Sequence, residues 1–114
     1  MTRKIILDCD PGHDDAVALL LAMGNPNINL LGITTVGGNQ TLDKVARNAL
    51  VVKEIAGHPE VPVYAGCDRP LVRPVEVAEA IHGSTGMDVE GVQLPEPSTA
   101  LADAHAIDFI IDTV

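Results

Sequence analysis

Aromatic and basic residues are scarce in this 114-residue chain, and both shortages limit what it can be. It contains one Tyr, one Phe and no Trp, so its core must be built from aliphatic side chains. Seven Lys and Arg residues stand against 16 Asp and Glu residues, which gives a formal net charge of -9. This balance argues against nucleic-acid backbones and anionic membrane surfaces as partners, and it is compatible with a cation or a neutral polar ligand.

Long apolar runs and a disulfide framework are also lacking. No stretch is apolar for long enough to act as a signal peptide or a membrane span. The two cysteines, Cys9 and Cys67, are expected to be reduced thiols. We therefore expect a cytoplasmic protein. The length and the 46% of hydrophobic residues fit a single domain over residues 1–114.

The hydrophobic pattern predicts alternating strands and helices. Strands are expected at residues 4–9, 29–36 and 61–64, and helices at about 14–23, 41–56 and 103–114. This order predicts an α/β fold with a Rossmann-like, open, mainly parallel sheet and flanking helices. Residues 65–100, which carry several prolines and glycines, are expected to form a long loop.

Two of the predicted helices allow further expectations. The helix at 14–23 is apolar nearly all round, so it should be sandwiched between other elements. In the helix at 41–56, Asp43 and Arg47 are four residues apart and should form a solvated ion pair. The helix at 103–114 shows no stop signal, so we expect that the domain is truncated at its C-terminus.

Four carboxylates, those of Asp8, Asp10, Asp14 and Asp15, fall between an apolar strand and an apolar helix. Carboxylates this close repel one another unless water, a cation or the donors of a ligand separate them. Either a solvated acidic turn or a metal or polyol site would explain the cluster, and the apolar flanks favour the site. Asp10 and Asn39 end neighbouring parallel strands, so they can face one ligand.

The donor types also limit the metal. Carboxylate oxygens without a nearby His or Cys pair favour Ca²⁺ or Mg²⁺ over zinc. An EF-hand loop starting at Asp8 fails, because Leu19 stands where a bidentate Glu is needed. An Asp-x-Asp pair such as Asp8 and Asp10 is also found in aspartate-nucleophile phosphatases. Those enzymes have a Thr or Val two residues after the second Asp, where this chain has Gly12.

Four segments, at the right spacings, resemble the inosine–uridine preferring nucleoside hydrolase family. They are spread along most of the chain: Leu7-Asp8-Cys9-Asp10-Pro11-Gly12-His13-Asp14-Asp15-Ala16, Gly32-Ile33-Thr34-Thr35-Val36-Gly37-Gly38-Asn39, Val63-Tyr64-Ala65-Gly66 and Ile81-His82-Gly83-Ser84-Thr85-Gly86. Cys9 and His13 are similar to the bacterial pyrimidine-preferring members. The resemblance implies a ribonucleoside hydrolase, a glycosidase of nucleoside salvage that cleaves the N-glycosidic bond of uridine, cytidine or inosine to ribose and free base.

The resemblance also implies a role for each site residue. Asp10 and Asp15 would ligate a Ca²⁺ ion, and Asp10 would act as general base toward the attacking water. Asp14 and Asn39 would bind ribose hydroxyls, and Asp8 would orient Asp10 or a neighbour from behind. His82 would contact the base and assist its departure. Family members are much longer and commonly dimeric or tetrameric, so this chain would carry only part of the site.

Plainer interpretations stay open for these residues. Asp8 is equally well explained as a structural hydrogen-bond acceptor, Asn39 as a turn residue that caps the next helix, and His82 as a surface histidine. The chain as a whole is alternatively a non-catalytic nucleoside- or ribose-binding module, or a fragment that assembles with a second chain. Base preference cannot be assigned from the sequence.

Overall fold

A three-stranded parallel sheet organises the fold. The computed structural model describes residues 2–77, 86–87 and 93–114. Its elements, in chain order, are β1 (Arg3–Cys9), α1 (His13–Gly24), β2 (Ile28–Thr35), α2 (Leu42–Ile55), β3 (Val63–Ala65) and α4 (Ala106–Thr113). The strands lie in the order β1-β2-β3, and both strand pairs are parallel. The predicted α/β class with a parallel sheet is therefore confirmed.

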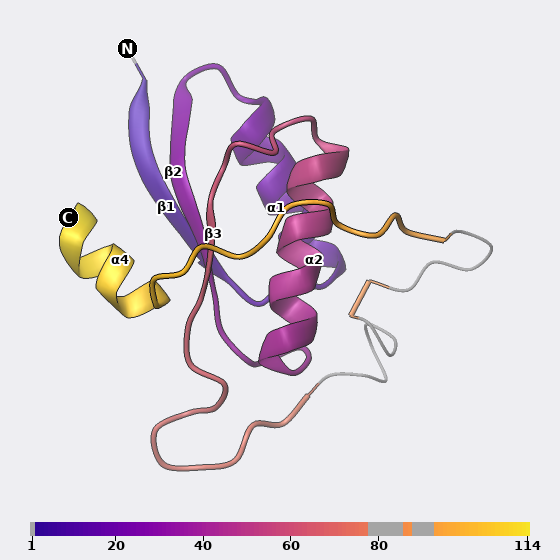
Figure 1. Cartoon of the computed structure of the whole chain (residues 1–114), viewed down its shortest axis with the longest axis vertical. Helices are drawn as coiled ribbons and strands as arrows, with labels where there is room; N and C mark the ends of the chain where they lie inside the picture. The colour runs from indigo at the N-terminus through magenta and orange to yellow at the C-terminus, as the bar shows by residue number, and fades with distance from the viewer. Residues whose placement is uncertain (1, 78–85, 88–92) are drawn as a thin grey trace.

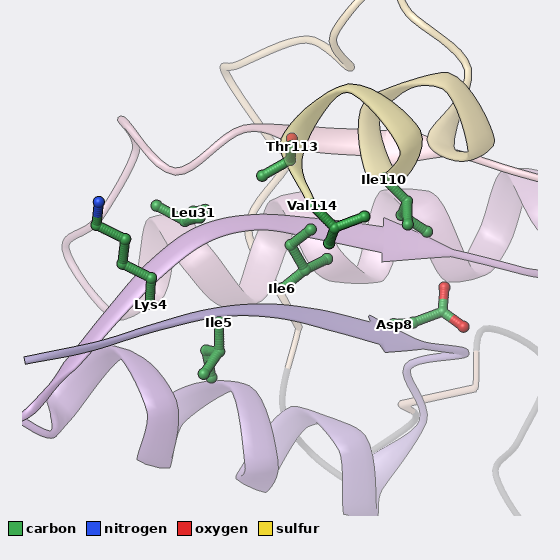
Figure 2. Close-up of a pocket in the computed structure, with 8 residues that line it drawn as sticks. All are labelled: Lys4, Ile5, Ile6, Asp8, Leu31, Ile110, Thr113 and Val114. Atoms are coloured by element: carbon green, nitrogen blue, oxygen red, sulfur yellow. The ribbon is translucent and has the colours of Figure 1, made fainter.

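Helices cover both faces of the sheet. Helices α1 and α2 lie on one face and α4 lies on the other (Figures 1 and 2). Leu7, Ile33 and Val63 are neighbours across the three strands and belong to the core beneath α1 and α2. Because side chains alternate along a strand, the next register positions, such as Ile6 and Gly32, face α4.

The core between the sheet and the two helices is aliphatic, as the lack of aromatic residues requires. Leu19 of α1 is fully buried there. The apolar stripe of α2 follows the helical spacing and is buried as expected, through Val45, Ala46, Ala49, Leu50 and Val52. Burying a valine or leucine side chain in this way stabilises the fold by about 1.5–3 kcal/mol.

Several sequence expectations were wrong in detail. Helix α1 is not sandwiched: Val17 and Leu21 are 65% and 69% exposed, because the described elements cover only its Leu19 and Ala22 side. Helix α4 begins at Ala106 and not at residue 103, because the His105 side chain caps it by accepting a hydrogen bond from the Ile107 amide. Strand β3 begins at Val63, two residues after the expected start at residue 61.

The described parts of the expected loop, residues 66–77, 86–87 and 93–100, contain no helix or strand. Among the described residues, no helix has the length and apolarity needed to cross a membrane.

Candidate functional site

The carboxyl ends of the three strands form one rim, and the loops that leave them are bonded side by side. The Val36 amide donates to the Cys9 carbonyl (3.2 Å), and the Gly37 amide donates to the Cys67 carbonyl (3.0 Å). Ligands of parallel α/β sheets bind at this kind of rim. It carries Asp10 after β1 and Asn39 after β2, while Asp14 and Asp15 start α1.

Asp10 and Asn39 are joined by two hydrogen bonds. The Asn39 amide donates to Asp10 Oδ2 (2.9 Å), and Asn39 Nδ2 donates to the Asp10 carbonyl (2.9 Å). A glycine is needed beside them, because a methyl group at Gly38 would collide with Asp10 Oδ2. The structure thus brings together two residues that are 29 positions apart in the sequence, as their places at neighbouring strand ends predicted.

Asp15 closes the acidic loop (residues 10–15) onto itself. The Asp10 amide donates to Asp15 Oδ2 (3.0 Å). Asp14 and Asp15 both lie in the first turn of α1, where the positive end of the helix dipole favours negative charge. Asp15 is half-buried, whereas Asp14 is exposed.

The electrostatics of the loop favour a cation. Burial raises the pKa of the Asp15 carboxyl above its ordinary value, and the nearby Asp10 and Asp14 carboxylates raise it further, although the Asp10 backbone hydrogen bond acts the other way. A positive charge placed between these carboxylates would favour their ionised forms and offset the repulsion between them. The donors are hard oxygens, which fit Ca²⁺ or Mg²⁺.

The described residues offer only part of such a metal site. Within them, no group of three or more His, Cys, Asp or Glu side chains is arranged to hold a metal ion. Ca²⁺ takes about six to eight oxygens, and Asp10 and Asp15 cannot provide them all. The two carboxylates therefore fit the ion chemically, while further ligands must come from elsewhere.

Asp8 lies apart from this cluster, on the α4 face of the sheet. Its Oδ1 accepts a hydrogen bond from Thr34 Oγ1 on β2 (2.6 Å). Figure 2 shows Asp8 at the edge of a groove of about 480 Å³ between β1 and α4, which is lined mainly by aliphatic side chains. The contact with Thr34 is that of a structural acceptor, and the role expected for Asp8 behind Asp10 stays a prediction.

His82 lies outside the described residues, so its predicted role is likewise left as a prediction. Gly86, four positions further on, is described and has a positive φ of 87°. It packs against Asn48 and Gln40 and near the Pro11 carbonyl. Gly86 therefore lies beside the buried Asn48 and Gln40 side chains and near the backbone of the acidic loop.

Sequence reasoning missed two buried polar residues near the rim. Gln40 and Asn48 are 1% and 2% exposed, and Asn48 Nδ2 donates to the Pro11 carbonyl (3.0 Å). Asn48 had a detectable signal, because it is a polar residue within the apolar stripe of α2. Gln40 follows Asn39 directly and gave no comparable signal.

The two thiols differ in their surroundings. Both cysteines are free, Cys9 buried and Cys67 exposed. Burial raises the pKa of the Cys9 thiol to about 12, with the Asp15, Asp8 and Asp10 carboxylates adding to the shift. A thiol with so high a pKa is protonated at physiological pH, and a protonated thiol is a poor nucleophile.

The sequence of the chain is similar to those of known nucleoside hydrolases. The profile of the inosine-uridine preferring nucleoside hydrolases matches residues 5–114. The inosine-uridine preferring nucleoside hydrolase of Crithidia fasciculata is 58% identical over 115 residues, covering 100% of this chain and 36% of the relative. A pyrimidine-specific ribonucleoside hydrolase of Escherichia coli, RihB, is 53% identical over 113 residues, covering 98% and 35%.

Solved structures agree with these sequence relatives. A purine-preferring ribonucleoside hydrolase from Gardnerella vaginalis superposes with a TM-score of 0.89 at 39% identity, over 97% of this chain and 36% of that protein. The chain spans about a third of the length of the proteins it matches. Because the match includes both the acidic loop and the Asn39 turn, the chain belongs to the inosine-uridine preferring nucleoside hydrolase family.

Proposed function

We propose that this chain forms the N-terminal part of the active site of a ribonucleoside hydrolase. The reaction adds water across the N-glycosidic bond of uridine, cytidine or inosine and yields ribose and the free base. Family membership supports the reaction class. The observation that carries the proposal is the Asp10 carboxylate, bonded to the Asn39 amide and adjacent to Asp15 at the sheet rim.

The residues present fit distinct parts of this reaction. Asp10 and Asp15 would hold a Ca²⁺ ion, which when bound lowers the pKa of a water and fixes its position. The Asp10 carboxylate would accept the proton of the attacking water as general base. Asp14, exposed at the start of α1, and Asn39 would bind ribose hydroxyls and so orient the sugar. His82 would donate a proton to the departing base.

We also propose a cellular setting for the protein. Two free cysteines are typical of a reducing compartment, which supports a cytoplasmic location and a role in nucleoside salvage. Relatives named for inosine-uridine and for pyrimidine preference match the chain about equally well, so we assign no base preference. We also propose that the longer protein is a homodimer or homotetramer.

Substitution of Asp10 tests the metal part of the proposal. Asp10→Asn keeps the shape of the side chain but removes its charge, so Ca²⁺ binding by the chain, measured by titration calorimetry, should be lost. Asp43→Asn is the matched control, because Asp43 is exposed at the start of α2 and bonded to Thr41. Unchanged Ca²⁺ affinity in Asp10→Asn would contradict the metal site and favour the interpretation of the cluster as a solvated acidic turn.

A reducing-sugar assay tests the catalytic part. The 114-residue chain, given uridine or inosine with Ca²⁺, should release little or no ribose, because Asp10 and Asp15 leave the coordination of the metal incomplete. Robust turnover by this chain would contradict the view that it holds only part of the site. Nucleoside binding without ribose release from the longer protein would favour a binding module instead.

A further inference from the structure

Asn48 places a buried amide group directly behind the acidic loop. It lies on α2 within the stripe formed by Val45, Ala49 and Val52, and it is 2% exposed. A polar group buried among apolar side chains is costly unless it is hydrogen-bonded. Asn48 Nδ2 donates to the Pro11 carbonyl at 3.0 Å, in a buried environment. The amide therefore bonds to the backbone of the loop.

The position of the Pro11 carbonyl affects the geometry of the acidic loop. Pro11 follows Asp10, and the peptide that it forms with Gly12 leads directly into α1, whose first turn holds Asp15. Both Pro11 and Gly12 are buried. A shift of this peptide would change the position of Asp15 relative to Asp10. At present the Asp10 amide donates a hydrogen bond to Asp15 Oδ2 at 3.0 Å.

Gly86 lies close to the Asn48 amide and leaves room for it. A Cβ atom at Gly86 would lie 3.1 Å from Asn48 Nδ2, 3.2 Å from Gln40 Cγ and 3.5 Å from the Pro11 carbonyl oxygen. Gly86 also has a φ of 87°, which favours glycine. Gly86 therefore lies close both to Asn48, which bonds to the acidic loop, and to Gln40, which follows Asn39.

We propose that Asn48 is a positioning residue that sets the separation of Asp10 and Asp15, and thereby the affinity of the loop for a divalent cation. It would act through the Pro11 carbonyl, to which its Nδ2 donates. The inference rests on the proposed function in its metal-binding part. Replacing a residue that hydrogen-bonds a metal ligand directly typically changes metal affinity by about 10–100-fold, and for Asn48, one peptide removed from Asp10, we expect the lower end of this range.

Asn48→Leu is the test variant, because leucine has a similar shape and lacks the donor. Ca²⁺ affinity of the 114-residue chain, measured by titration calorimetry, should fall about tenfold or more. The exchange of the Asp10 and Asn39 amide protons, measured by NMR without metal, should become faster. Gly86→Ala should act in the same direction, since its methyl group would press on Asn48.

Lys53→Met is the matched control. Lys53 is also a buried side chain of α2, and its Nζ donates to the Pro59 and Val61 carbonyls at the far end of the helix (3.0 and 2.7 Å). This variant should lose stability, but it should keep its Ca²⁺ affinity within about twofold and its slow exchange at Asp10 and Asn39.

The outcomes separate the proposals. Equal effects of Lys53→Met and Asn48→Leu on exchange at the rim, or no effect of Asn48→Leu and Gly86→Ala, would overturn the positioning role. If the unsubstituted chain binds no Ca²⁺, the metal-binding proposal fails, while selectively faster exchange at Asp10 and Asn39 still establishes that Asn48 positions the loop.

Discussion

Glu54 illustrates how a single carboxylate on α2 fastens a distant segment to the fold. It accepts hydrogen bonds from the Ser98 amide and hydroxyl (2.8 and 2.9 Å) and from the Thr99 amide and hydroxyl (3.0 and 2.6 Å). The bond from the Ser98 amide contributes most to lowering the pKa of Glu54 to about 2. Three residues after Thr99, the Ala102 amide donates to the Val63 carbonyl of β3.

The lowered pKa of Glu54 predicts a loss of stability in acid. The ionised form is favoured in the folded state, so its contribution is fully present above the ordinary value of 4.5 and is lost as pH falls toward about 2. Urea unfolding at pH 7 and at pH 3 should show that Glu54→Gln lowers stability more at pH 7. The exposed Glu76→Gln variant serves as control, and equal losses at both pH values would contradict the prediction.

At the scale of residues, prediction succeeded where position in the sheet was enough. Asp10 and Asn39 end neighbouring parallel strands, so their proximity followed from the strand order alone. The supports of the site could not be predicted in this way. Asn48 meets Pro11 across 37 positions, and Glu54 meets Ser98 across 44, and no local pattern encodes such pairs.

The packing of α4 against the sheet depends on a glycine, Gly32. The Phe109 ring of α4 stacks on Tyr64 of β3, with centroids 3.9 Å apart and an interplanar angle of 11°. Gly32 of β2 lies beneath this pair, and a Cβ atom there would be 2.7 Å from Phe109 Cζ. The absence of a side chain at Gly32 therefore makes room for the helix.

Gly32→Ala should displace α4 from the sheet. Tyr64 is the one tyrosine of the chain, and no tryptophan is present, so near-ultraviolet circular dichroism reports its stacking on Phe109. The tyrosine signal should weaken, and stability should fall by about 1–3 kcal/mol, while the far-ultraviolet spectrum changes little. Gly24→Ala is the control, because nothing lies within 4 Å of a Cβ at that position. A full tyrosine signal in Gly32→Ala would refute this account.

At the scale of elements, the order of strands and helices was predictable and some side-chain pairings were not. The expected Asp43–Arg47 ion pair was wrong. Asp43 accepts from the Thr41 hydroxyl, and Arg47 pairs with Glu96 at 2.6 Å. A spacing of four residues favours a pair by only about 0.2–0.5 kcal/mol, so a better-placed partner from a distant segment readily replaces it.

At the scale of the whole molecule, large apolar side chains are exposed on α1 and on α4. Val17 and Leu21 of α1 are 65% and 69% exposed, and Ile107 and Ile111 of α4 are 48% and 64% exposed. Strand β1 pairs with β2 alone among the described strands, so its other edge is open to further pairing. The chain spans about a third of the length of its relatives. Among the described elements, none covers the Val17 and Leu21 side of α1, so this helix is not sandwiched as expected.

The exposed apolar faces predict that the chain associates with itself. Covering a leucine or isoleucine side chain stabilises a contact by about 1.5–3 kcal/mol, whereas the net charge of -9 opposes association through repulsion that salt screens. Light scattering should therefore give a mass above the monomer value of 11.9 kDa, and this mass should rise with protein and salt concentration. The double variant Leu21→Lys, Ile111→Lys should restore the monomer. Val72→Lys, at a loop position that is 92% exposed, should leave the association intact, and a monomeric mass for the unsubstituted chain at every concentration would show that these faces do not bind one another.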